Sequence, residues 1–430
     1  MQLIKNPNKN SWSTLLKRPI QSLESIEKTV NQIFDDVQRN GDAAISKYTA
    51  MFDGVTIENS IVTKEEIETA IKSIPENLKQ AITIAKQNIE TFHIAQKTGR
   101  VEVETTKGVK CWQEKRPIQN IGLYIPGGSA PLFSTVLMLA VPAKIAGCQE
   151  IVLCSPPNAS GKIANEILYT AQLCGVTKII KVGGIQAIAG LTFGTNTILK
   201  VSKIFGPGNQ FVTVAKQLAT KFGVAIDMPA GPSELLVVAD DTANAAYVAS
   251  DLLSQAEHGV DSQVILVTTS ETLLNAVAVE IEAQLKALPR QSIAEKAIAN
   301  SKLILVENDS IALELINDYA PEHFIICTKG TDFYVNGIIN AGSVFIGNYT
   351  PESAGDYASG TNHTLPTNGF SKAYSGVNLD SFTKSITFQS ITKEGLLNLG
   401  NTIELMAEAE GLQAHKNAVT IRLNDLKSNK

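Results

Sequence analysis

Short apolar runs rich in Ile, Val and Leu recur from about residue 121, each followed by small or turn-forming residues and then by a helical stretch. Continuous apolar runs are typical of strands buried on both faces of a parallel sheet. Strands that alternate with helices of roughly 10 to 18 residues indicate βαβ units. The runs are residues 121–125, 151–154, 178–182, 203–205, 234–239, 264–268, 303–306, 324–327 and 344–346. The pattern predicts an α/β protein with parallel sheets.

The two ends of the chain carry other patterns. Residues 20–52 and 64–97 have the spacing of amphipathic helices, and residues 101–118 alternate around Thr106-Lys107-Gly108, which predicts a hairpin. Residues 393–426 are helical in pattern, with a break near Gly411. Because no Gly/Ser linker separates these parts, we expect interleaved domains.

The turns between residues 121 and 210 are rich in Gly, Pro and Asn. They comprise residues 126–128 (PGG), 156–158 (PPN), 183–184 (GG) and 206–209 (GPGN). Turns at the carboxyl ends of parallel strands are where ligands bind, and glycine lets backbone N–H groups approach a phosphate. None matches G-x-G-x-x-G. The turns alone therefore favour nucleotide binding and ordinary tight turns equally.

Charge, hydropathy and cysteine usage narrow the class of protein. The formal net charge of -5 comes from interspersed acids and bases, which argues against nucleic-acid binding. No signal peptide is expected, and the longest apolar stretch, residues 136–146, is too short for a bilayer, so we expect no membrane partner. Five cysteines without a CxxC pair fit a reduced cytoplasm.

Four of the five histidines lie in short polar clusters, and His93 is expected to be structural. Gln255 and His258 share one face at the end of a predicted helix, where they could hold a cation. Taken alone, this pair is better explained by a histidine that interacts with the helix dipole.

Glu322 and His323 precede a predicted strand, where adjacent side chains point to opposite sides unless the chain bends at Pro321. They could serve as two general bases, although a polar surface loop explains them equally well.

Two further clusters lie toward the carboxyl end. Asp356 and His363 fall in the polar, glycine-rich segment 347–369, which is either a functional or a mobile surface loop. Glu410 and His415 flank Gly411 and could form a hook, or could be ordinary exposed helix residues.

Taken together, these segments resemble the histidinol dehydrogenase family. The resemblance rests on IGLYIPGGSAPLFSTVLMLAVPAKIAGC, IFGPGNQFVTVAK, IDMPAGPSELLVVAD, LLSQAEHG, APEHF, AGDYASGTNHTLPT and EGLQAHKNAV, in the family's order. It implies oxidation of L-histidinol to L-histidine through L-histidinal with two NAD⁺, the final steps of histidine biosynthesis. The alternative is a relative that oxidises another small amino alcohol or diol with NAD.

The resemblance also implies a homodimer with one Zn²⁺ per subunit. The implied metal ligands are Gln255, His258 and Asp356, with His415 from the partner subunit. The implied substrate contacts are Ser233, His323, His363 and Glu410, and the metal ligands are implied to contact the substrate as well. Glu410 and His415 would act across the subunit interface. The implied NAD contacts are Tyr124, Gln186 and Asn209. His323 would remove the hydroxyl proton and Glu322 would activate water for the second oxidation.

The expected fold is two interleaved Rossmann-like, incomplete doubly wound domains with small helical extensions. We expect an N-terminal extension at 1–21, a first domain from 22–125 and 234–376, an NAD-binding domain at 126–233, and a C-terminal extension at 377–430 that contributes to the partner's site.

Overall fold

The computed structural model describes residues 1–19, 23–127 and 130–428, which form two compact units. The first unit comprises Met1–Gln96 and Ile118–Phe382, and the second comprises Lys97–Pro117 and Thr383–Lys430. Two parallel sheets lie in the first unit and one antiparallel sheet lies in the second. The predicted α/β class with parallel sheets is confirmed.

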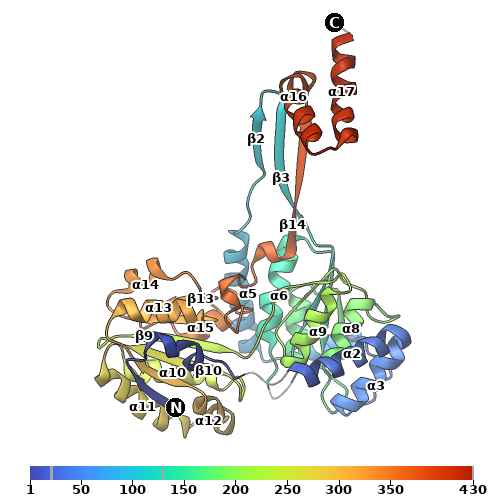
Figure 1. Cartoon of the computed structure of the whole chain (residues 1–430). Helices are drawn as coiled ribbons and strands as arrows, with labels where there is room; N and C mark the ends of the chain where they lie inside the picture. Colours follow the sequence, from blue (N-terminus) through green and yellow to red (C-terminus); the bar gives the residue numbers. More distant parts are fainter. Residues whose placement is uncertain (20–22, 128–129, 429–430) are drawn as a thin grey trace. The chain divides into compact units, whose positions relative to one another are not determined.

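One parallel sheet of the first unit has six strands in the order β1-β11-β10-β9-β12-β13. Its strands are β1 (Gln2–Lys5), β9 (Glu234–Ala239), β10 (Gln263–Thr268), β11 (Lys302–Leu305), β12 (His323–Cys327) and β13 (Ser343–Ile346). One face packs against α10 (Ala245–Ala256), α11 (Glu271–Leu285) and α12 (Gln291–Ala299). The other packs against α13 (Asp309–Tyr319) and α14 (Thr331–Gly337) (Figure 1). Burial on both faces explains the unbroken apolar runs.

The other parallel sheet has five strands in the order β6-β5-β4-β7-β8. These are β4 (Asn120–Tyr124), β5 (Glu150–Ser155), β6 (Lys178–Lys181), β7 (Lys203–Phe205) and β8 (Ala225–Ile226). One face is covered by α4 (Lys64–Ser73), α5 (Glu76–Ile94), α6 (Phe133–Ala146) and α7 (Asn165–Leu173). The opposite face is covered by α2 (Leu23–Asn40), α3 (Asp42–Asp53), α8 (Gly184–Phe193) and α9 (Gln210–Thr220).

Short elements complete the first unit. They are η1 (Lys9–Ser11), α1 (Trp12–Leu15), α15 (Glu352–Tyr357), η2 (Phe370–Lys372) and η3 (Leu379–Phe382). Within the described ranges, no helix combines the length and the apolar character needed to cross a lipid bilayer.

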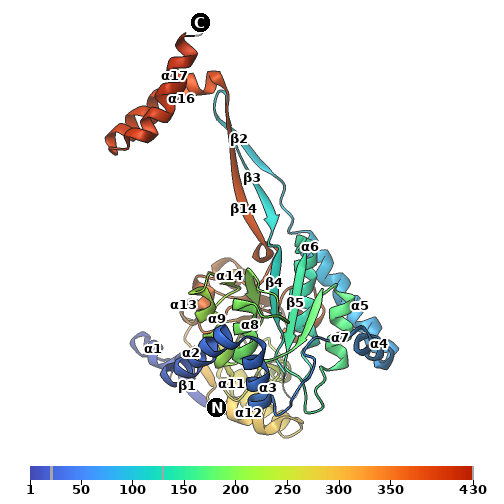
Figure 2. The ribbon, with the colours of Figure 1, turned by 90° about the vertical axis from the view of Figure 1, so that its right-hand side faces the viewer.

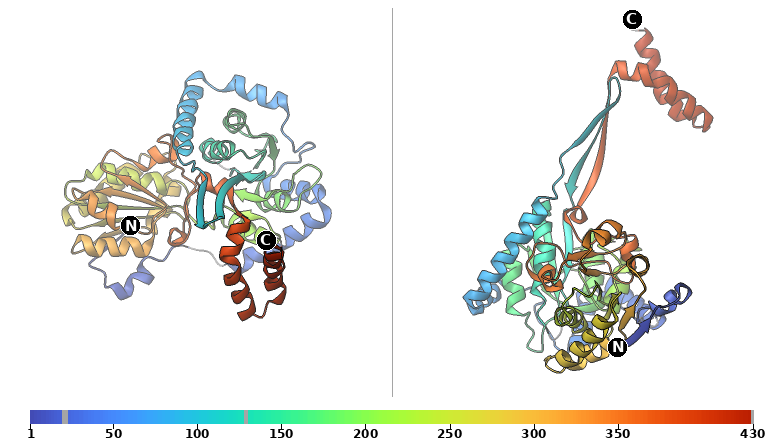
Figure 3. Two further views of the ribbon diagram at one scale, coloured as in Figure 1. Left: turned by 90° about the horizontal axis from the view of Figure 1, so that it is seen from above. Right: turned by 90° about the vertical axis from the view of Figure 1, so that its left-hand side faces the viewer.

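The second unit is a three-stranded antiparallel sheet followed by a pair of helices (Figures 2 and 3). The expected hairpin is β2 (Val101–Thr106) and β3 (Val109–Pro117), and β14 (Thr383–Ile391), which was not expected, pairs with β3. The helices are α16 (Lys393–Ala409) and α17 (Gln413–Ser428). The predicted helix break near Gly411 is confirmed, since this glycine has a φ of 73°.

The amino-terminal helices differ from the sequence-based prediction. Each of the two predicted long helices is divided in two, the first at Gly41, which has a φ of 52°, and the second at Ile74 and Pro75. A left-handed glycine and a proline, which lacks an N–H group, both stop a helix from continuing.

Strand pairing also differs from the expected domain division. Strand β4 was assigned to the same domain as residues 234–376, but it pairs with β5 and β7. Strand β1, assigned to an extension, pairs with β11. The hairpin 101–117 belongs with the carboxyl-terminal residues. The expected boundary at residues 21–22 and Gly128 of the PGG turn lie outside the described residues.

A buried ion pair holds the GPGN turn that follows β7. Lys216 Nζ lies 2.5 Å from Asp227 Oδ1 and donates to the Gly206 carbonyl at 2.7 Å, while Asp227 Oδ2 accepts from Gly206 N–H at 2.8 Å. Gly206 has a φ of 126°, and a Cβ there would lie 2.1 Å from the carbonyl oxygen of Tyr124. The turn therefore requires both the glycine and the buried charges.

We predict that Lys216→Met lowers the free energy of unfolding by about 3–5 kcal/mol, because it leaves the Asp227 carboxylate buried without its cation. Lys216→Met/Asp227→Asn should recover part of this loss, since neither charge remains. Lys47→Met, which removes an exposed partner of Asp36, is the control and should lower the free energy of unfolding far less than Lys216→Met does. Urea denaturation measures all three, and equal losses for Lys216→Met and Lys47→Met would contradict the prediction.

Candidate functional site

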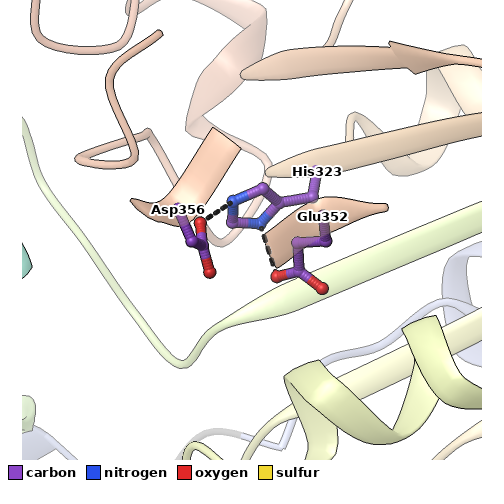
Figure 4. Close-up of side chains that lie close together, drawn as sticks. All are labelled: His323, Glu352 and Asp356. Atoms are coloured by element: carbon purple, nitrogen blue, oxygen red, sulfur yellow. Dashed lines mark ion pairs between the residues drawn. The ribbon is translucent and has the colours of Figure 1, made fainter. Parts of the chain in front are cut away.

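The principal polar cluster lies at the amino ends of β9 and β12. These strands pair in parallel with His323 opposite Leu235, which brings Glu234 beside the start of β12. His323 Nδ1 lies 3.2 Å from the Glu234 carbonyl oxygen, 3.6 Å from Glu352 Oε1 and 3.7 Å from Glu322 Oε2. Its Nε2 lies 3.5 Å from Asp356 Oδ1 (Figure 4). One buried imidazole is thus surrounded by three carboxylates.

A bend before β12 lets Glu322 and His323 reach the same cluster. Ala320 has a φ of 55°, in the left-handed region, immediately before Pro321. Both side chains are buried, so a polar surface loop does not describe them. Glu322 Oε2 accepts from the Glu234 N–H at 2.8 Å. The bend that the proline suggested is present.

Helix α15 contributes Glu352 and Asp356, four residues apart on one face. Glu352 is buried, and its Oε2 accepts from the Ser254 hydroxyl at 3.1 Å. The Gln255 amide nitrogen donates to Glu352 Oε1 at 2.5 Å, and the amide oxygen accepts from Glu234 N–H at 3.0 Å. Sequence reasoning identified Asp356 and missed Glu352, although their i,i+4 spacing was a usable signal.

Burial and charge shift the pKa values of the cluster strongly. Burial raises the pKa of Glu322 to about 8 and that of Glu352 to about 8, with His323 opposing both changes. Burial lowers the pKa of His323, but Glu352, Glu322 and Asp356 outweigh burial and raise it to about 10. Burial raises the pKa of Asp356, but His323 outweighs it, so the net pKa is lowered. These groups can hold and exchange protons near neutral and alkaline pH.

His363 joins the cluster from the polar segment 347–369. Its Nδ1–H donates to the carbonyl oxygen of Asp356 at 2.8 Å, so Nε2 is free to accept from the Thr135 hydroxyl at 3.2 Å. Burial lowers the pKa of His363, which favours the neutral ring. Asn362 is buried and donates to the carbonyl of Met138 at 2.6 Å. The segment around His363 is therefore anchored to α6.

The side chains at the end of α10 have the donors that a metal ion requires. Gln255 is fully buried, and its amide oxygen has a second lone pair besides the one that faces Glu234 N–H. His258 follows the helix, and desolvation lowers its pKa, with Asp356 opposing the change. A neutral imidazole, an amide oxygen and a carboxylate fit Zn²⁺. Ligand atoms of His323, Glu352 and Asp356 also lie within 4.8 Å of one another.

A cavity of about 1010 Å³ opens at the carboxyl ends of β4 and β5 and the amino ends of α8 and α9. It is lined by Tyr124, Gln186 and Asn209, and also by Phe52 and Asp53, which sequence reasoning missed. Among the described residues neither amide atom of the fully buried Gln186 has a hydrogen-bond partner. The Tyr124 hydroxyl accepts from Gly184 N–H at 3.1 Å. The cavity lies beside β4, the strand from which the strand order of this parallel sheet runs in two opposite directions, to β5 and to β7. Such a switch point suits a nucleotide.

Four other histidines and polar residues singled out in the sequence are Ser233, Glu410, His415 and His93. Ser233 directly precedes Glu234, and its carbonyl accepts from Gln263 N–H at 3.1 Å. Glu410 and His415 are exposed in the second unit, at the end of α16 and in α17. His93 is fully buried, with Nδ1 bonded to the Ile89 carbonyl at 2.8 Å.

Comparisons with known proteins agree along the whole chain. The family model described as histidinol dehydrogenase matches residues 16–423. Histidinol dehydrogenase from Bacteroides thetaiotaomicron is 60% identical, covering 99% of this chain and 100% of that protein. The enzyme of Escherichia coli strain K12 is 55% identical, covering 96% and 95%.

Solved structures give the same result. The crystal structure of histidinol dehydrogenase from Elizabethkingia anophelis superposes with a TM-score of 0.97 at 56% identity, covering 99% of both chains. An acetylating aldehyde dehydrogenase from Geobacillus thermoglucosidasius shares the fold alone, with a TM-score of 0.50 at 14% identity, covering 89% and 94%. This chain belongs to the histidinol dehydrogenase family.

Proposed function

We propose that this protein oxidises L-histidinol to L-histidine through L-histidinal with two NAD⁺. The observation that carries the proposal is the buried cluster at β9 and β12, in which Glu322 and His323 converge beside Asp356. Two neighbouring groups that can each hold a proton suit a reaction with two successive oxidations. The whole-length relationship to the family supports the same substrate.

The five-stranded sheet would act as the Rossmann-like NAD domain and the six-stranded sheet as a second Rossmann-like domain. Tyr124, Gln186 and Asn209 would contact the dinucleotide, and its phosphates would face the amino ends of α8 and α9. The unpaired amide of Gln186 supports this role, since a buried polar group without a partner is costly. When bound, NAD⁺ accepts a hydride from the substrate carbon in each oxidation.

Gln255, His258 and Asp356 would hold one zinc ion, with His415 of the partner subunit. When bound, zinc supplies a positive charge that orients the imidazole and amino nitrogens of the substrate. Ser233 and His363, with Glu410 of the partner subunit, would complete the substrate contacts beside these ligands. The proposed assembly is therefore a homodimer with shared sites.

His323 would take the hydroxyl proton of histidinol as the hydride leaves the carbon that bears this hydroxyl, which gives the aldehyde. Glu322 would then take a proton from water as the water oxygen adds to the aldehyde. His323, after releasing its first proton to solvent, would take the remaining hydroxyl proton of the hydrated aldehyde as the second hydride leaves, which gives the carboxylate. A thiolate is not required. Burial raises the pKa of Cys154 and of Cys327 to about 12, which keeps both thiols protonated.

The two proposed bases can be separated by mutation. We predict that His323→Asn slows both oxidations by roughly 10²-fold or more, whereas Glu322→Gln slows mainly the oxidation of histidinal by a similar factor. Single-turnover rates with histidinol and with histidinal measure the two steps. Equal losses in both steps for Glu322→Gln would contradict the division of roles.

The rate should rise with pH. A base must be deprotonated to act, so His323, with a pKa of about 10, gains activity toward pH 10, and Glu322 gains activity through about pH 8. A cation beside Asp356 lowers both pKa values without changing this sign. Initial rates between pH 6 and 10 test the prediction, and the inflection in histidinal oxidation should vanish in Glu322→Gln. A rate that falls as pH rises from 7 to 9 would refute it.

Zinc content distinguishes the proposed ligands, which include His258, from the alternative set of His323, Glu352 and Asp356. We expect His258→Ala and Asp356→Asn to lose most of the bound zinc, at least about tenfold in affinity. Glu352→Gln should retain zinc, because Ser254 and Gln255 already occupy its oxygens. Elemental analysis after dialysis measures the outcome. Loss of zinc from Glu352→Gln with retention in His258→Ala would favour His323, Glu352 and Asp356 as the ligands.

Mixed dimers test the shared site. His258→Ala and His415→Ala should each be inactive alone, but a heterodimer contains one doubly damaged site and one intact site. Random mixing should therefore restore about one quarter of wild-type activity for a dimer with two sites. Activity after subunit exchange, with unmixed variants as controls, measures this. Absence of recovery despite proven exchange would place His415 outside the partner's site.

A further inference from the structure

Arg18 forms a buried ion pair with the first residue of β9. Its Nε donates to Glu234 Oε1 at 2.5 Å and its Nη2 donates to Oε2 at 2.8 Å, so the fork contacts both carboxylate oxygens. The two side chains are 13% and 1% exposed, which excludes a solvated surface pair. Nη2 also donates to the carbonyl of Tyr319 at 2.7 Å, and the guanidinium lies 4.0 Å from the centre of the Tyr319 ring.

The peptide groups of Glu234 contact both proposed bases. The backbone N–H donates to Glu322 Oε2 at 2.8 Å, and the backbone carbonyl faces His323 Nδ1 at 3.2 Å. The same N–H also faces the amide oxygen of Gln255 at 3.0 Å. The position of one backbone segment therefore determines where three side chains of the cluster lie.

The side chain of Glu234 is what anchors that backbone segment. Besides Arg18, its Oε1 accepts from the Asn368 N–H at 2.6 Å, which ties it to the end of the polar segment. Burial raises the pKa of Glu234, and Arg18 opposes that rise. A bidentate guanidinium–carboxylate pair constrains direction as well as distance, which a point charge does not.

We propose that Arg18 is a positioning residue, which fixes the Glu234 side chain and through it the backbone that orients Glu322 and His323. The inference rests on the roles proposed for those two residues. Among the described residues, no hydrogen bond or ion pair joins Arg18 to Glu322 or His323, so Arg18 acts on their geometry through Glu234. A displacement of about 1 Å at a reacting group lowers a rate by up to roughly 10²-fold.

The experiment compares Arg18→Ala, Arg18→Lys and wild type, each loaded with zinc. Arg18→Ala should lower kcat at least about tenfold with a smaller change in KM, and Arg18→Lys should be intermediate. Added guanidinium ion, at millimolar concentration, should restore part of the kcat of Arg18→Ala. Zinc content should stay near the wild-type level, because the Glu234 peptide contacts one of the proposed ligands, Gln255, through a single hydrogen bond. Lys5→Ala, which removes an exposed amino-terminal ion pair with Glu271, is the control and should keep wild-type kcat.

If Arg18 only stabilised the fold, kcat would recover whenever the melting temperature recovers. The variant Arg18→Met/Glu234→Gln leaves no unpaired buried charge, so its melting temperature should recover relative to Arg18→Ala while kcat stays low. The inference is overturned if kcat per folded molecule is unchanged in Arg18→Ala, or if kcat recovers with stability in the double variant. If wild type itself does not oxidise histidinol, the proposed function fails instead.

Discussion

The parallel register between β9 and β12 is the constraint on which the candidate site depends. Because His323 lies opposite Leu235, the peptide of Glu234 is held against the residues that begin β12. Neighbouring strands lie about 4.8 Å apart, a distance at which backbone and side-chain groups can bond across them. A shift of one residue would turn His323 to the other face of the sheet. The register therefore determines which side chains meet in the candidate site as well as how the strands pair.

Burial of charge at these strand ends is unfavourable unless each charge has partners. The cluster meets this requirement through charges of opposite sign and backbone donors: Arg18 with Glu234, His323 with three carboxylates, and Glu234 N–H with Glu322. Among the described residues, His323 Nε2 has no hydrogen-bond partner, although Asp356 is near. A buried nitrogen of this kind is available to a substrate.

The sequence predicted the strands well because they are covered on both faces, which makes their apolar runs continuous. It also located the glycine-rich turns, since few residues other than glycine fit a position such as Gly206. Glu322 and His323 were predicted together, with a bend at Pro321 as the condition for their convergence. The sequence did not predict that Ala320 would take the left-handed conformation that produces this bend.

Other features depend on contacts between distant parts of the chain. The pair of Arg18 and Glu234 spans 216 positions, and β14 pairs with a hairpin far from it in sequence. Strand β4 belongs to the five-stranded sheet because it pairs with β5 and β7. Its amino-acid composition alone does not indicate which of the two parallel sheets it joins. The roles of Glu410 and His415 rest on the family resemblance and on a dimer, so they remain predictions.

The stoichiometry of the reaction distinguishes two successive oxidations of L-histidinol from a single oxidation. With zinc-loaded protein, excess NAD⁺ and a limiting amount of L-histidinol, the absorbance of NADH and chromatography of the products count both oxidations. The proposed mechanism predicts two NADH and one L-histidine for each L-histidinol, without release of free aldehyde. Formation of one NADH with accumulation of histidinal would contradict it, as would inactivity toward histidinol in a preparation that oxidises another amino alcohol or diol.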